Sequence, residues 1–281
     1  MNRLSGVSDQ VAIVTGASSG IGEATAERLL RAGYTVYAGA RRVDRMAGLA
    51  EQGVTTAELD VTDDASMVAF VDRVIAERGR IDVLVSNAGY GSYGAVEDVP
   101  LEEGRRQFEA NLFGLARMTQ LVTPSMRAAR SGRIVNISSI GGRFYEALGA
   151  WYHASKFAVE GFSDSLRLEL HEFGIQVIII EPGPVRTEWG DAAYDSAEKY
   201  SGAGAYAPQV RAMKALYAQA DERGTEPSVI AETIVSAVTA RRPKVRYAAP
   251  FSAKAIIATV TLVPDRLLDA VLRAMMSRFR R

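Results

Sequence analysis

Cysteine is absent from the 281 residues of this chain, and histidine occurs only twice, as His153 and His171. Without cysteine the chain can form neither a disulfide framework nor a thiolate nucleophile, and it offers no sulfur ligand for zinc. Two histidines are also too few for a histidine-rich metal site. We therefore expect no resident metal. The lack of cysteine is compatible with the reducing cytoplasm, where we expect the protein to be.

Two further features are missing: an excess of one charge and a long hydrophobic run. Lys plus Arg and Asp plus Glu number 33 each, so no overall field attracts nucleic acid, and we do not expect it as a partner. A spanning helix needs about 18 or more apolar residues in a row. The most apolar stretch, Ala255 to Val263, is short, and the N-terminal MNRLSGVSDQ lacks the apolar segment of a signal peptide. We predict neither a spanning helix nor secretion.

What the chain does contain is a regular alternation of short apolar runs with amphipathic segments. This alternation predicts βαβ units, and runs as apolar as VIII at Val177 are expected in a parallel sheet with helices on both faces. The predicted strands are VAIVTG from Val11, TVYAGA from Thr35, a run ending at Leu59, IDVLVSNAG from Ile81, RIVNISS from Arg133, IQVIIIEPG from Ile175 and KVRYAAP from Lys244. The pattern predicts a doubly wound α/β fold.

The pattern loosens between Asp191 and Gly224, where Gly, Ala, Ser and Tyr surround SGAGAYAP. We interpret residues 188–225 as a mobile loop that acts as a substrate lid inside a single domain of residues 1–281. A helix follows this loop, and Ser228, next to Pro227, is a candidate for its N-cap.

Residues 251–281 are predicted to form a C-terminal helical extension with a locally positive charge. Six basic residues stand against only Asp265 and Asp269. Apolar residues recur there at helical spacing: Leu267, Leu268, Val271, Leu272 and Met275. Such a stripe suits a helix docked on the body or on a second copy of the chain, and it also suits peripheral contact with a membrane surface. We favour docking, because an amphipathic stripe usually belongs to a core.

A glycine-rich turn, TGASSGIG, runs from Thr15 to Gly22 between the first predicted strand and the first predicted helix. Gly16, Gly20 and Gly22 lack a Cβ atom, so the backbone can turn tightly and approach a pyrophosphate closely. The helix N-terminus then offers free N–H groups and the positive end of its dipole. A plain turn between a strand and a helix is the alternative, but the Gly-x-x-x-Gly-x-Gly spacing favours a dinucleotide site.

TGASSGIG, SNAG at Ser86 and YHASK at Tyr152 together resemble the motifs of the short-chain dehydrogenase/reductase family, over roughly Gln10 to Thr187. The resemblance implies a Rossmann-type domain with a mostly parallel seven-stranded sheet, in the order 3-2-1-4-5-6-7, and helices on both faces. It implies an oxidoreductase that transfers a hydride between a nicotinamide and a carbonyl or alcohol. It also implies a homodimer or homotetramer that pairs through the helices around Phe113 and Phe157.

The loop after the second strand selects the cofactor in this family: an acidic residue binds the ribose hydroxyls of NAD, and Arg accommodates the 2′-phosphate of NADP. This chain has Arg41 and Arg42 there, with no carboxylate at the strand end. Two guanidinium groups can pair with the phosphate. We therefore expect NADP(H) rather than NAD(H), the alternative being that both arginines belong to a solvated helix start.

The resemblance implies further cofactor contacts at the ends of other strands. Asp60 and Val61 match a pair that contacts adenine, although Asp60 is also a candidate cap for the following helix. The turn after SNAG would lie beneath the cofactor, and PGPVRT at Pro182 would hold the nicotinamide carboxamide. The full predicted set is Gly16, Ser18, Ser19, Gly20, Ile21, Gly22, Arg41, Arg42, Asp60, Val61, Asn87, Ala88, Gly89, Tyr152, Lys156, Pro182, Gly183, Val185 and Thr187.

Tyr152 and Lys156 are four residues apart in a predicted helix, which places them on one face about a turn apart. Reduction of a carbonyl leaves negative charge on its oxygen, so a proton donor is needed there. A tyrosine titrates near about 10, and a cation about 4 Å away contributes roughly 4 kcal/mol at an effective dielectric constant near 20. We therefore expect Lys156 to bring the pKa of Tyr152 toward neutrality.

The resemblance assigns the remaining catalytic roles. Ser139 matches the family's serine, and its neighbour Ser138 is the weaker candidate. Asn111 matches an asparagine that holds a water between the lysine and solvent, which implies a proton relay from Tyr152 through Lys156. Taken alone, Asn111 is equally explained as a buried structural amide. We interpret His153, inside YHASK, as a packing residue.

Aromatic side chains gather in the predicted loops at the carboxyl ends of the strands, where ligands bind in this architecture: Tyr90, Tyr93, Phe144, Tyr145, Trp151, Trp189 and Tyr194. They favour a bulky apolar alcohol or ketone, and the chain is similar to the steroid and retinol dehydrogenase branch of the family. The same motifs fit a reductase of 3-oxoacyl thioesters. A regulator that binds NADP without turnover is a third hypothesis.

Overall fold

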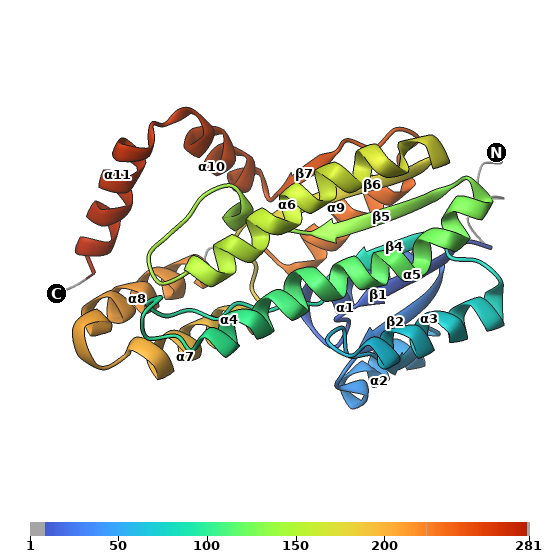
Figure 1. The fold of residues 1–281 in the computed structure, drawn as a ribbon, viewed down its shortest axis with the longest axis horizontal. Helices are drawn as coiled ribbons and strands as arrows, with labels where there is room; N and C mark the ends of the chain where they lie inside the picture. Colours follow the sequence, from blue (N-terminus) through green and yellow to red (C-terminus); the bar gives the residue numbers. More distant parts are fainter. Residues whose placement is uncertain (1–8, 223, 280–281) are drawn as a thin grey trace.

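The computed structural model describes residues 9–222 and 224–279, and its centre is a seven-stranded sheet (Figure 1). The strand order is β3-β2-β1-β4-β5-β6-β7, and each pair of neighbouring strands is parallel. The predicted fold class and strand order are therefore confirmed. The strands are β1 (Val11–Thr15), β2 (Thr35–Ala40), β3 (Thr55–Glu58), β4 (Val83–Ser86), β5 (Gly132–Ile137), β6 (Ile175–Pro182) and β7 (Arg246–Ala249).

Continuous apolar strands explain why the sheet lies in the middle of the molecule. All five residues of β1 are buried, with Val11 and Ile13 packing on one face of the sheet and Ala12 and Val14 on the other. Because successive side chains of a strand point to opposite faces, a strand that is apolar at every position needs a cover on both. Two hydrophobic cores therefore form, one on each face.

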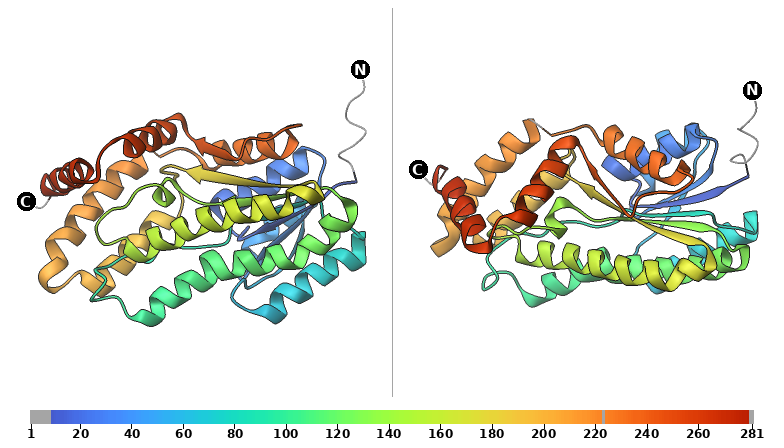
Figure 2. Two further views of the ribbon diagram at one scale, coloured as in Figure 1. Left: turned by 45° about the horizontal axis from the view of Figure 1, so that its top comes forward. Right: turned by 90° about the horizontal axis from the view of Figure 1, so that it is seen from above.

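Helices α1, α2 and α9 cover one face, and α3, α5 and α6 cover the other, as the view from above in Figure 2 shows. Their bounds are α1 (Gly20–Arg31), α2 (Ala47–Glu51), α9 (Pro227–Thr239), α3 (Asp64–Arg78), α5 (Gly114–Ala129) and α6 (Ala150–Leu170). Helix α4 (Leu101–Phe108) continues into α5 through a π-helical turn, η2 (Glu109–Phe113). Short 3-10 turns are η1 (Val43–Met46), η3 (Ile140–Gly142) and η4 (His171–Phe173).

The segment predicted as a mobile loop is instead mostly helical: α7 (Trp189–Ser201), a 3-10 turn η5 (Gly204–Tyr206) and α8 (Ala207–Glu222). The loop prediction is wrong because many of its small residues are alanines at helical spacing. Ala193 and Ala197 of α7, with Val210 and Met213 of α8, are buried in a third apolar cluster. Alanine has the highest helix propensity, so this segment needs little further help to form helices.

The predicted start of the next helix needs a small correction. Helix α9 begins at Pro227, with Glu226 as its N-cap residue, so Ser228 lies inside the first turn and does not cap it. Proline suits this first position because its fixed φ is already helical and its missing N–H has no helical partner to lose.

The C-terminal extension forms two helices, α10 (Phe251–Leu262) and α11 (Asp265–Ser277), drawn in red at one end of Figure 1. Helix α10 lies beside β7 and η3, and α11 packs against α8. Within residues 9–222 and 224–279, no helix is both long enough and apolar enough to span a membrane. Arg280 and Arg281, counted among the basic residues of this segment, lie outside the described residues.

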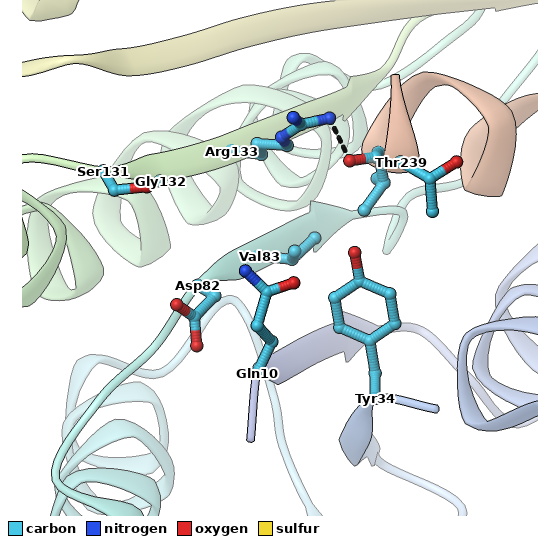
Figure 3. A pocket seen from close by; sticks show the side chains of 9 residues that line it. Gln10, Tyr34, Asp82, Val83, Ser131, Gly132, Arg133 and Thr239 are labelled. Carbon is cyan, nitrogen blue, oxygen red and sulfur yellow. Dashed lines mark hydrogen bonds between the residues drawn. The ribbon is translucent and has the colours of Figure 1, made fainter. Parts of the chain in front are cut away.

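At the amino-terminal end of the strands, opposite these helices, a small pocket of about 130 Å³ is lined by polar groups (Figure 3). Arg133 donates to the main-chain oxygens of Ala237 (3.0 Å) and Val238 near the C-terminal end of α9. A cation there complements the helix dipole. The Asp82 carboxylate accepts the main-chain N–H of Val11 at 2.8 Å. These charged groups therefore join helix and strands.

Candidate active site

The turn between β1 and α1 has the shape that its glycines allow. Gly16 and Gly20 have φ angles of 67° and 60°, a region that favours glycine. The N–H of Gly16 donates to the main-chain oxygen of Gly39 in β2 at 2.8 Å, which fixes the turn against the neighbouring strand. Helix α1 thus begins with free N–H groups at the carboxyl edge of the sheet, as phosphate sites do. Ser18 and Ser19 lie half-buried in this turn, followed by Ile21, which packs on the first core.

The SNAG segment after β4 braces this turn. Asn87 Nδ2 donates to the main-chain oxygens of Thr15 (3.0 Å) and Gly16 (3.1 Å). No room is left for further side chains between the two segments. A Cβ on Gly22 would lie 2.5 Å from Asn87 Nδ2, and a Cβ on Gly16 would lie 2.8 Å from Ala88 Cα. The two motifs therefore form one packed unit.

Arg41 and Arg42 follow directly after β2, and both are exposed. Arg42 Nη2 lies 3.8 Å from Oε2 of Glu188, at the start of α7. Arg45, which the sequence analysis missed, donates to both oxygens of the same carboxylate at 2.9 and 2.5 Å. This hydrogen-bonded pair raises the pKa of Arg45 and lowers that of Glu188. The loop after β2 therefore presents three arginines, and the Glu188 carboxylate lies against two of them, Arg42 and Arg45.

Asp60 and Val61 follow β3 at the carboxyl edge of the sheet, where the resemblance places adenine. The alternative that Asp60 caps α3 is wrong, because the N-cap is Asp63, whose carboxylate accepts the N–H of Ala65 at 3.1 Å. Asp60 Oδ1 instead accepts the main-chain N–H of Thr62 at 2.9 Å and its hydroxyl at 2.7 Å. A contact of Asp60 with adenine stays a prediction.

Tyr152 and Lys156 lie one turn apart on α6, and both are buried. Lys156 Nζ is 6.0 Å from the centre of the Tyr152 ring. The same ammonium group donates to the main-chain oxygen of Ile137, the last residue of β5, at 2.9 Å. This bond fixes the lysine against the carboxyl end of the sheet, so phenol and ammonium group lie at the end where the glycine turn lies.

The pKa of Tyr152 differs from the expectation drawn from its spacing to Lys156. Burial raises it to about 12; a hydrogen bond with Ser139 lowers it, and the charge of Glu146 raises it. Burial also lowers the pKa of Lys156 to about 8, against the opposite effect of Glu160. The expectation that Lys156 brings the pKa of Tyr152 toward neutrality is therefore wrong. It considered only the charge of Lys156 and left out the hydration that the phenol loses on burial. Tyr152 is therefore protonated at neutral pH.

Ser139 and the turn after it pack against Tyr152. Ser139 Oγ accepts the main-chain N–H of Gly141 at 3.0 Å, which fixes the start of η3. A Cβ on Gly141 would lie 3.1 Å from Cε1 of Tyr152. The ring of His153 is buried, and its Nδ1 lies 2.8 Å from the main-chain oxygen of Gly141. The environment of His153 is that of a packing residue, as its place in the motif suggests.

Asn111 lies in the π-helical turn between α4 and α5, and such turns often mark functional sites. Its Oδ1 accepts the N–H of Tyr90 at 2.9 Å, and its Nδ2 donates to the main-chain oxygen of Tyr90 at 2.9 Å and to Ser155 Oγ at 3.0 Å. A Cβ on Gly89 would lie 2.7 Å from Asn111 Oδ1. Asn111 thus joins the loop after β4 to the helix that carries Lys156, and its part in a proton relay stays a prediction.

Aromatic rings surround Tyr152. The ring of Trp189, the first residue of α7, is 4.9 Å from that of Tyr152, and Tyr93 is 5.6 Å from it. Tyr217 of α8 is 5.9 Å from Tyr93. Tyr194 joins the same apolar cluster. The candidate proton donor is therefore enclosed by large side chains from the loop after β4 and from the α7 and α8 segment.

Not every aromatic residue predicted near the substrate is part of this cluster. Trp151 packs edge-on against Phe108 instead, at 6.4 Å between ring centres. Tyr90 donates to the carboxylate of Glu103 at 3.0 Å, and Tyr145 donates to Asp269 of α11 at 3.1 Å. Position in a loop at the right edge of the sheet does not by itself say where a side chain points.

Glu146 is a polar group inside the aromatic cluster that the sequence analysis missed. Its Oε1 accepts the hydroxyl of Tyr93 at 3.3 Å and that of Tyr217, and it lies 3.8 Å from His153 Nε2. Its negative charge is one reason for the raised pKa of Tyr152. No local motif marks this residue, because its partners come from distant parts of the chain.

The PGPVRT segment after β6 lies against the glycine turn: a Cβ on Gly20 would lie 3.0 Å from Thr187 Cγ2. Val185 forms an isolated parallel bridge with Thr225, and the N–H of Arg186 donates to the main-chain oxygen of Thr225 at 2.9 Å. The two ends of the α7 and α8 segment are thus joined at its base. Pro182 ends β6, and Gly183 follows it.

Comparison with protein families and with curated proteins gives consistent matches. The family model described as short chain dehydrogenase matches residues 10–198. VdlC of Helicobacter pylori, named as a short-chain type dehydrogenase/reductase, is 35% identical and aligns with 94% of this chain and 96% of its own length. A 3-ketodihydrosphingosine reductase of Bacteroides thetaiotaomicron is 35% identical, with 94% and 97% covered. An NADPH-dependent 3-dehydrocapnine reductase of Ornithobacterium rhinotracheale is 34% identical, with 92% and 95% covered.

Solved structures match over the same length. A short-chain dehydrogenase from Streptomyces avermitilis superposes with a TM-score of 0.77 at 34% identity, covering 96% of this chain and 95% of that one. A short-chain dehydrogenase/reductase from Burkholderia phymatum in complex with NAD superposes with a TM-score of 0.78 at 26% identity, covering 94% and 95%.

Proposed function

The chain belongs to the short-chain dehydrogenase/reductase family, and we propose that it is an NADP(H)-dependent oxidoreductase acting on a carbonyl or alcohol of an apolar, lipid-like substrate. The observation that carries this proposal is the environment of Tyr152. Its phenol is buried among aromatic rings, its pKa is lowered by Ser139, and it is one helical turn from Lys156. This is the arrangement that proton transfer to a carbonyl oxygen requires.

The carboxyl edge of the sheet fits a dinucleotide. Gly16 and Gly20 leave the backbone open at the N-terminus of α1, where a pyrophosphate would lie. Arg41, Arg42 and Arg45 would hold a 2′-phosphate. When bound there, NADPH would supply the hydride. One relative is named NADPH-dependent and one structural neighbour holds NAD, so our preference for NADP rests on the arginines of this chain.

In the reductive direction Tyr152 donates its proton to the carbonyl oxygen as negative charge develops there. A phenol with a pKa of about 12 keeps its proton at neutral pH, and it is still a stronger acid than the alcohol it helps to form. The Ser139 hydroxyl donates a second hydrogen bond to the same oxygen. Lys156, held by the Ile137 oxygen, stabilises the phenol as it loses its proton.

The substrate class follows from the rings around Tyr152. Trp189, Tyr93 and Tyr217 provide large ring surfaces, and the hydroxyls of the two tyrosines are occupied by Glu146, which suits a long or bulky apolar ketone. Two of the relatives are named as reductases of 3-ketodihydrosphingosine and 3-dehydrocapnine. We therefore propose a lipid-like ketone as the substrate rather than a small polar one.

Three features of organisation belong to the same proposal. Residues 188–225 act as a lid, because α7 and α8 enclose Tyr152 and both ends of the segment meet at Thr225. Residues 1–281 form one Rossmann-type domain that residues 251–281 extend. The enzyme works in the cytoplasm as a homodimer or homotetramer.

The cofactor is tested by Michaelis constants for NADPH and NADH. We expect a lower constant for NADPH, and we expect the double substitution Arg41→Ala and Arg42→Ala to raise the constant for NADPH while leaving that for NADH nearly unchanged, because only NADPH carries the phosphate. A wild-type preference for NADH would contradict the assignment.

The substrate is tested by NADPH consumption with long-chain 3-keto lipids, steroids, retinoids, fatty aldehydes and 3-oxoacyl thioesters. We expect the highest kcat/KM with an apolar long-chain ketone. Fastest turnover of acyl thioesters would favour a 3-oxoacyl thioester reductase instead. Normal NADPH binding without turnover of any compound would favour a regulator that senses NADP.

A further inference from the structure

The outward side of α10 carries an apolar stripe. Phe251, Ala255, Ala258 and Leu262 recur at helical spacing, so they share one side of the helix, and all four are exposed. Phe251 and Leu262 are 80% and 82% exposed, more than any other large apolar side chain of residues 9–222 and 224–279. The opposite side, which includes the buried Ala253, faces the body. A surface helix of a globular protein normally has its polar side outward, whereas α10 exposes this apolar stripe beside the polar residues Ser252, Lys254, Thr259 and Thr261.

Helix α11 adds a second exposed apolar stripe. One side docks, as the sequence predicts: Leu268 is buried and Met276 packs on the aromatic cluster around Tyr152. Leu267, Val271 and Met275, at four-residue intervals, are nevertheless exposed. The apolar face of α11 is therefore wider than the part that docks. We call the exposed set the C-terminal apolar surface: Phe251, Ala255, Ala258, Leu262, Leu267, Val271 and Met275.

Basic side chains flank this surface. Lys254 is exposed next to the stripe of α10, a helix that contains no acidic residue. Arg278 follows Val271 by seven residues, so it continues the exposed line of α11. Asp265 and Asp269 lie one turn apart on the other side of α11, and Asp269 accepts the hydroxyl of Tyr145. An apolar stripe with a basic border is complementary to anionic headgroups above a hydrocarbon layer.

An open pocket of about 790 Å³ lies beside α10. Phe251 and Ile257 form part of its apolar wall, and its charged lining is mixed, with Lys244, Arg246 and Lys254 beside Glu181 and Glu232. The pocket therefore extends the apolar surface at this end but does not by itself select a charge.

The C-terminal apolar surface lies at the same end of the molecule as the candidate active site. Helix α11 packs against α8, and α8 with α7 encloses the rings around Tyr152. Figure 1 and both views of Figure 2 show α7, α8, α10 and α11 gathered beyond the carboxyl ends of the strands. A hydrophobic layer in contact with this end would lie close to the route into the site.

We propose that α10 and α11 bind the surface of an anionic lipid bilayer, lying on it without spanning it. Phe251, Leu262, Leu267, Val271 and Met275 enter the boundary between headgroups and hydrocarbon, and Lys254 and Arg278 pair with anionic headgroups. The binding brings the lid end of the molecule to the layer in which an apolar lipid dissolves. It extends the proposed function and does not depend on it, because membrane binding requires no turnover.

The test is co-sedimentation of the full chain with vesicles of phosphatidylcholine, with and without phosphatidylglycerol. We expect the protein to pellet with the anionic vesicles, and to be released at high salt because the basic residues contribute. The double substitution Phe251→Ser and Leu262→Ser should weaken binding roughly tenfold or more, because two buried apolar side chains are lost from the bound state. Leu168→Ser is the matched control, since Leu168 is 69% exposed but lies on α6, outside the C-terminal apolar surface.

Circular dichroism melting curves establish that both variants are folded. The proposal is overturned if the wild-type protein stays in the supernatant with anionic vesicles, or if the double variant binds as tightly as the wild type. A different result would indicate that a second copy of the chain covers the C-terminal apolar surface. In that case the wild type would not bind vesicles, and without lipid the double variant would be a monomer in sedimentation equilibrium where the wild type is an oligomer. Reductase turnover is measured separately, so failure of either proposal leaves the other unaffected.

Discussion

Tyr152 experiences two opposing effects on its pKa: burial raises it, and the hydrogen bond with Ser139 lowers it. Burial is the larger effect, so the pKa is about 12, and burial also brings the pKa of Lys156 to about 8. In carbonyl reduction the two shifts have different consequences. Tyr152 keeps the proton that it would donate in the proposed reaction, whereas Lys156 loses its charge at a pH not far above neutral.

Replacement of the phenol tests the role of Tyr152 directly. Tyr152→Phe removes the hydroxyl and keeps the ring among Trp189 and Tyr93, so we expect kcat to fall by roughly 10²- to 10⁴-fold while NADPH binding stays unchanged. Steady-state rates and a fluorescence titration with NADPH measure the two quantities. A variant that retained most of its activity would refute the role.

The pH dependence of reduction tests Lys156. Because its pKa is about 8, the positive charge is present at pH 7 and disappears as the pH rises through that value, well before Tyr152 with a pKa of about 12 loses its proton. We expect kcat/KM for reduction to fall on the alkaline side with a midpoint near 8. Lys156→Arg, which keeps its charge, should move the fall to higher pH if the variant is active. A fall seen only above pH 10 would assign the limb to Tyr152 instead.

Ion pairs join the loop after β2 to the start of α7, and no sequence motif predicts them. Glu188 pairs with Arg45 and lies near Arg42, the residue expected to bind the 2′-phosphate. If NADP binds as we propose, its 2′-phosphate and this carboxylate would compete for the same guanidinium groups. We therefore expect cofactor binding to be coupled to the position of the proposed lid.

We expect Glu188→Gln to strengthen NADPH binding by up to roughly fivefold, the range of an exposed ion pair, because the competing charge is gone. Binding of NADH should not change, since it lacks the phosphate. Isothermal titration with both cofactors measures the effect, and Glu222→Gln, exposed at the end of α8, is the control. Equal changes for both cofactors would count against the competition.

A buried carboxylate joins β6, β7 and α6. Glu181 is buried, 3.5 Å from Arg143 and 3.7 Å from Arg246, yet burial and the charge of Glu160 raise its pKa to about 7. The folded protein thus holds this proton more tightly than the unfolded chain, whose glutamate titrates at its ordinary value. The stability that the proton contributes is complete below the unfolded pKa and is lost as the pH rises through about 7.

We therefore expect Glu181→Gln to raise the free energy of unfolding by about 1 kcal/mol at pH 8 and by much less at pH 5.5, because glutamine carries no charge to bury. Urea denaturation at the two pH values measures the difference. Glu172→Gln, at an exposed position, is the control. A less stable variant at pH 8 would mean that the pairs with Arg143 and Arg246 outweigh burial.

Sequence patterns predicted the elements that have strong periodicity and the residues that stand in motifs. The glycine turn and the pairing of Tyr152 with Lys156 needed nothing more, whereas the strand order and the place of Ser139 came from the resemblance to the family. Helices α7 and α8 were missed because alanines give no clear apolar stripe until their partners are known. Glu146 and the pair of Arg45 with Glu188 were missed because they depend on contacts between distant segments, and the pKa of Tyr152 depends on burial, which spacing does not report.

The whole molecule carries exposed apolar side chains on more than one side. Besides the C-terminal apolar surface, Phe113 of η2 and Phe157 of α6 are 53% and 47% exposed, on elements that pack against each other. Two large exposed rings on neighbouring elements favour contact with another protein surface. We expect a second copy of the chain to cover this side, as the resemblance implies.

Sedimentation velocity tests this assembly. We expect the wild-type chain to be a dimer or tetramer, and the double substitution Phe113→Ser and Phe157→Ser to raise the dissociation constant of this contact by about tenfold or more, because two aromatic anchors are lost. Leu262→Ser should leave the assembly unchanged. A wild-type monomer, or a double variant that associates normally, would contradict the prediction.

The hydrogen bond from Arg186 to Thr225 has a consequence for how this protein could change over evolutionary time. The α7 and α8 segment leaves the body and returns to it at one point. Its length can therefore vary at small entropic cost, and no strand has to shift. In the proposed function, substrate selectivity and proton transfer would thereby depend on separate parts of the chain. We expect a graft of this segment from a relative to transfer that relative's substrate preference while the proposed catalytic residues stay unchanged.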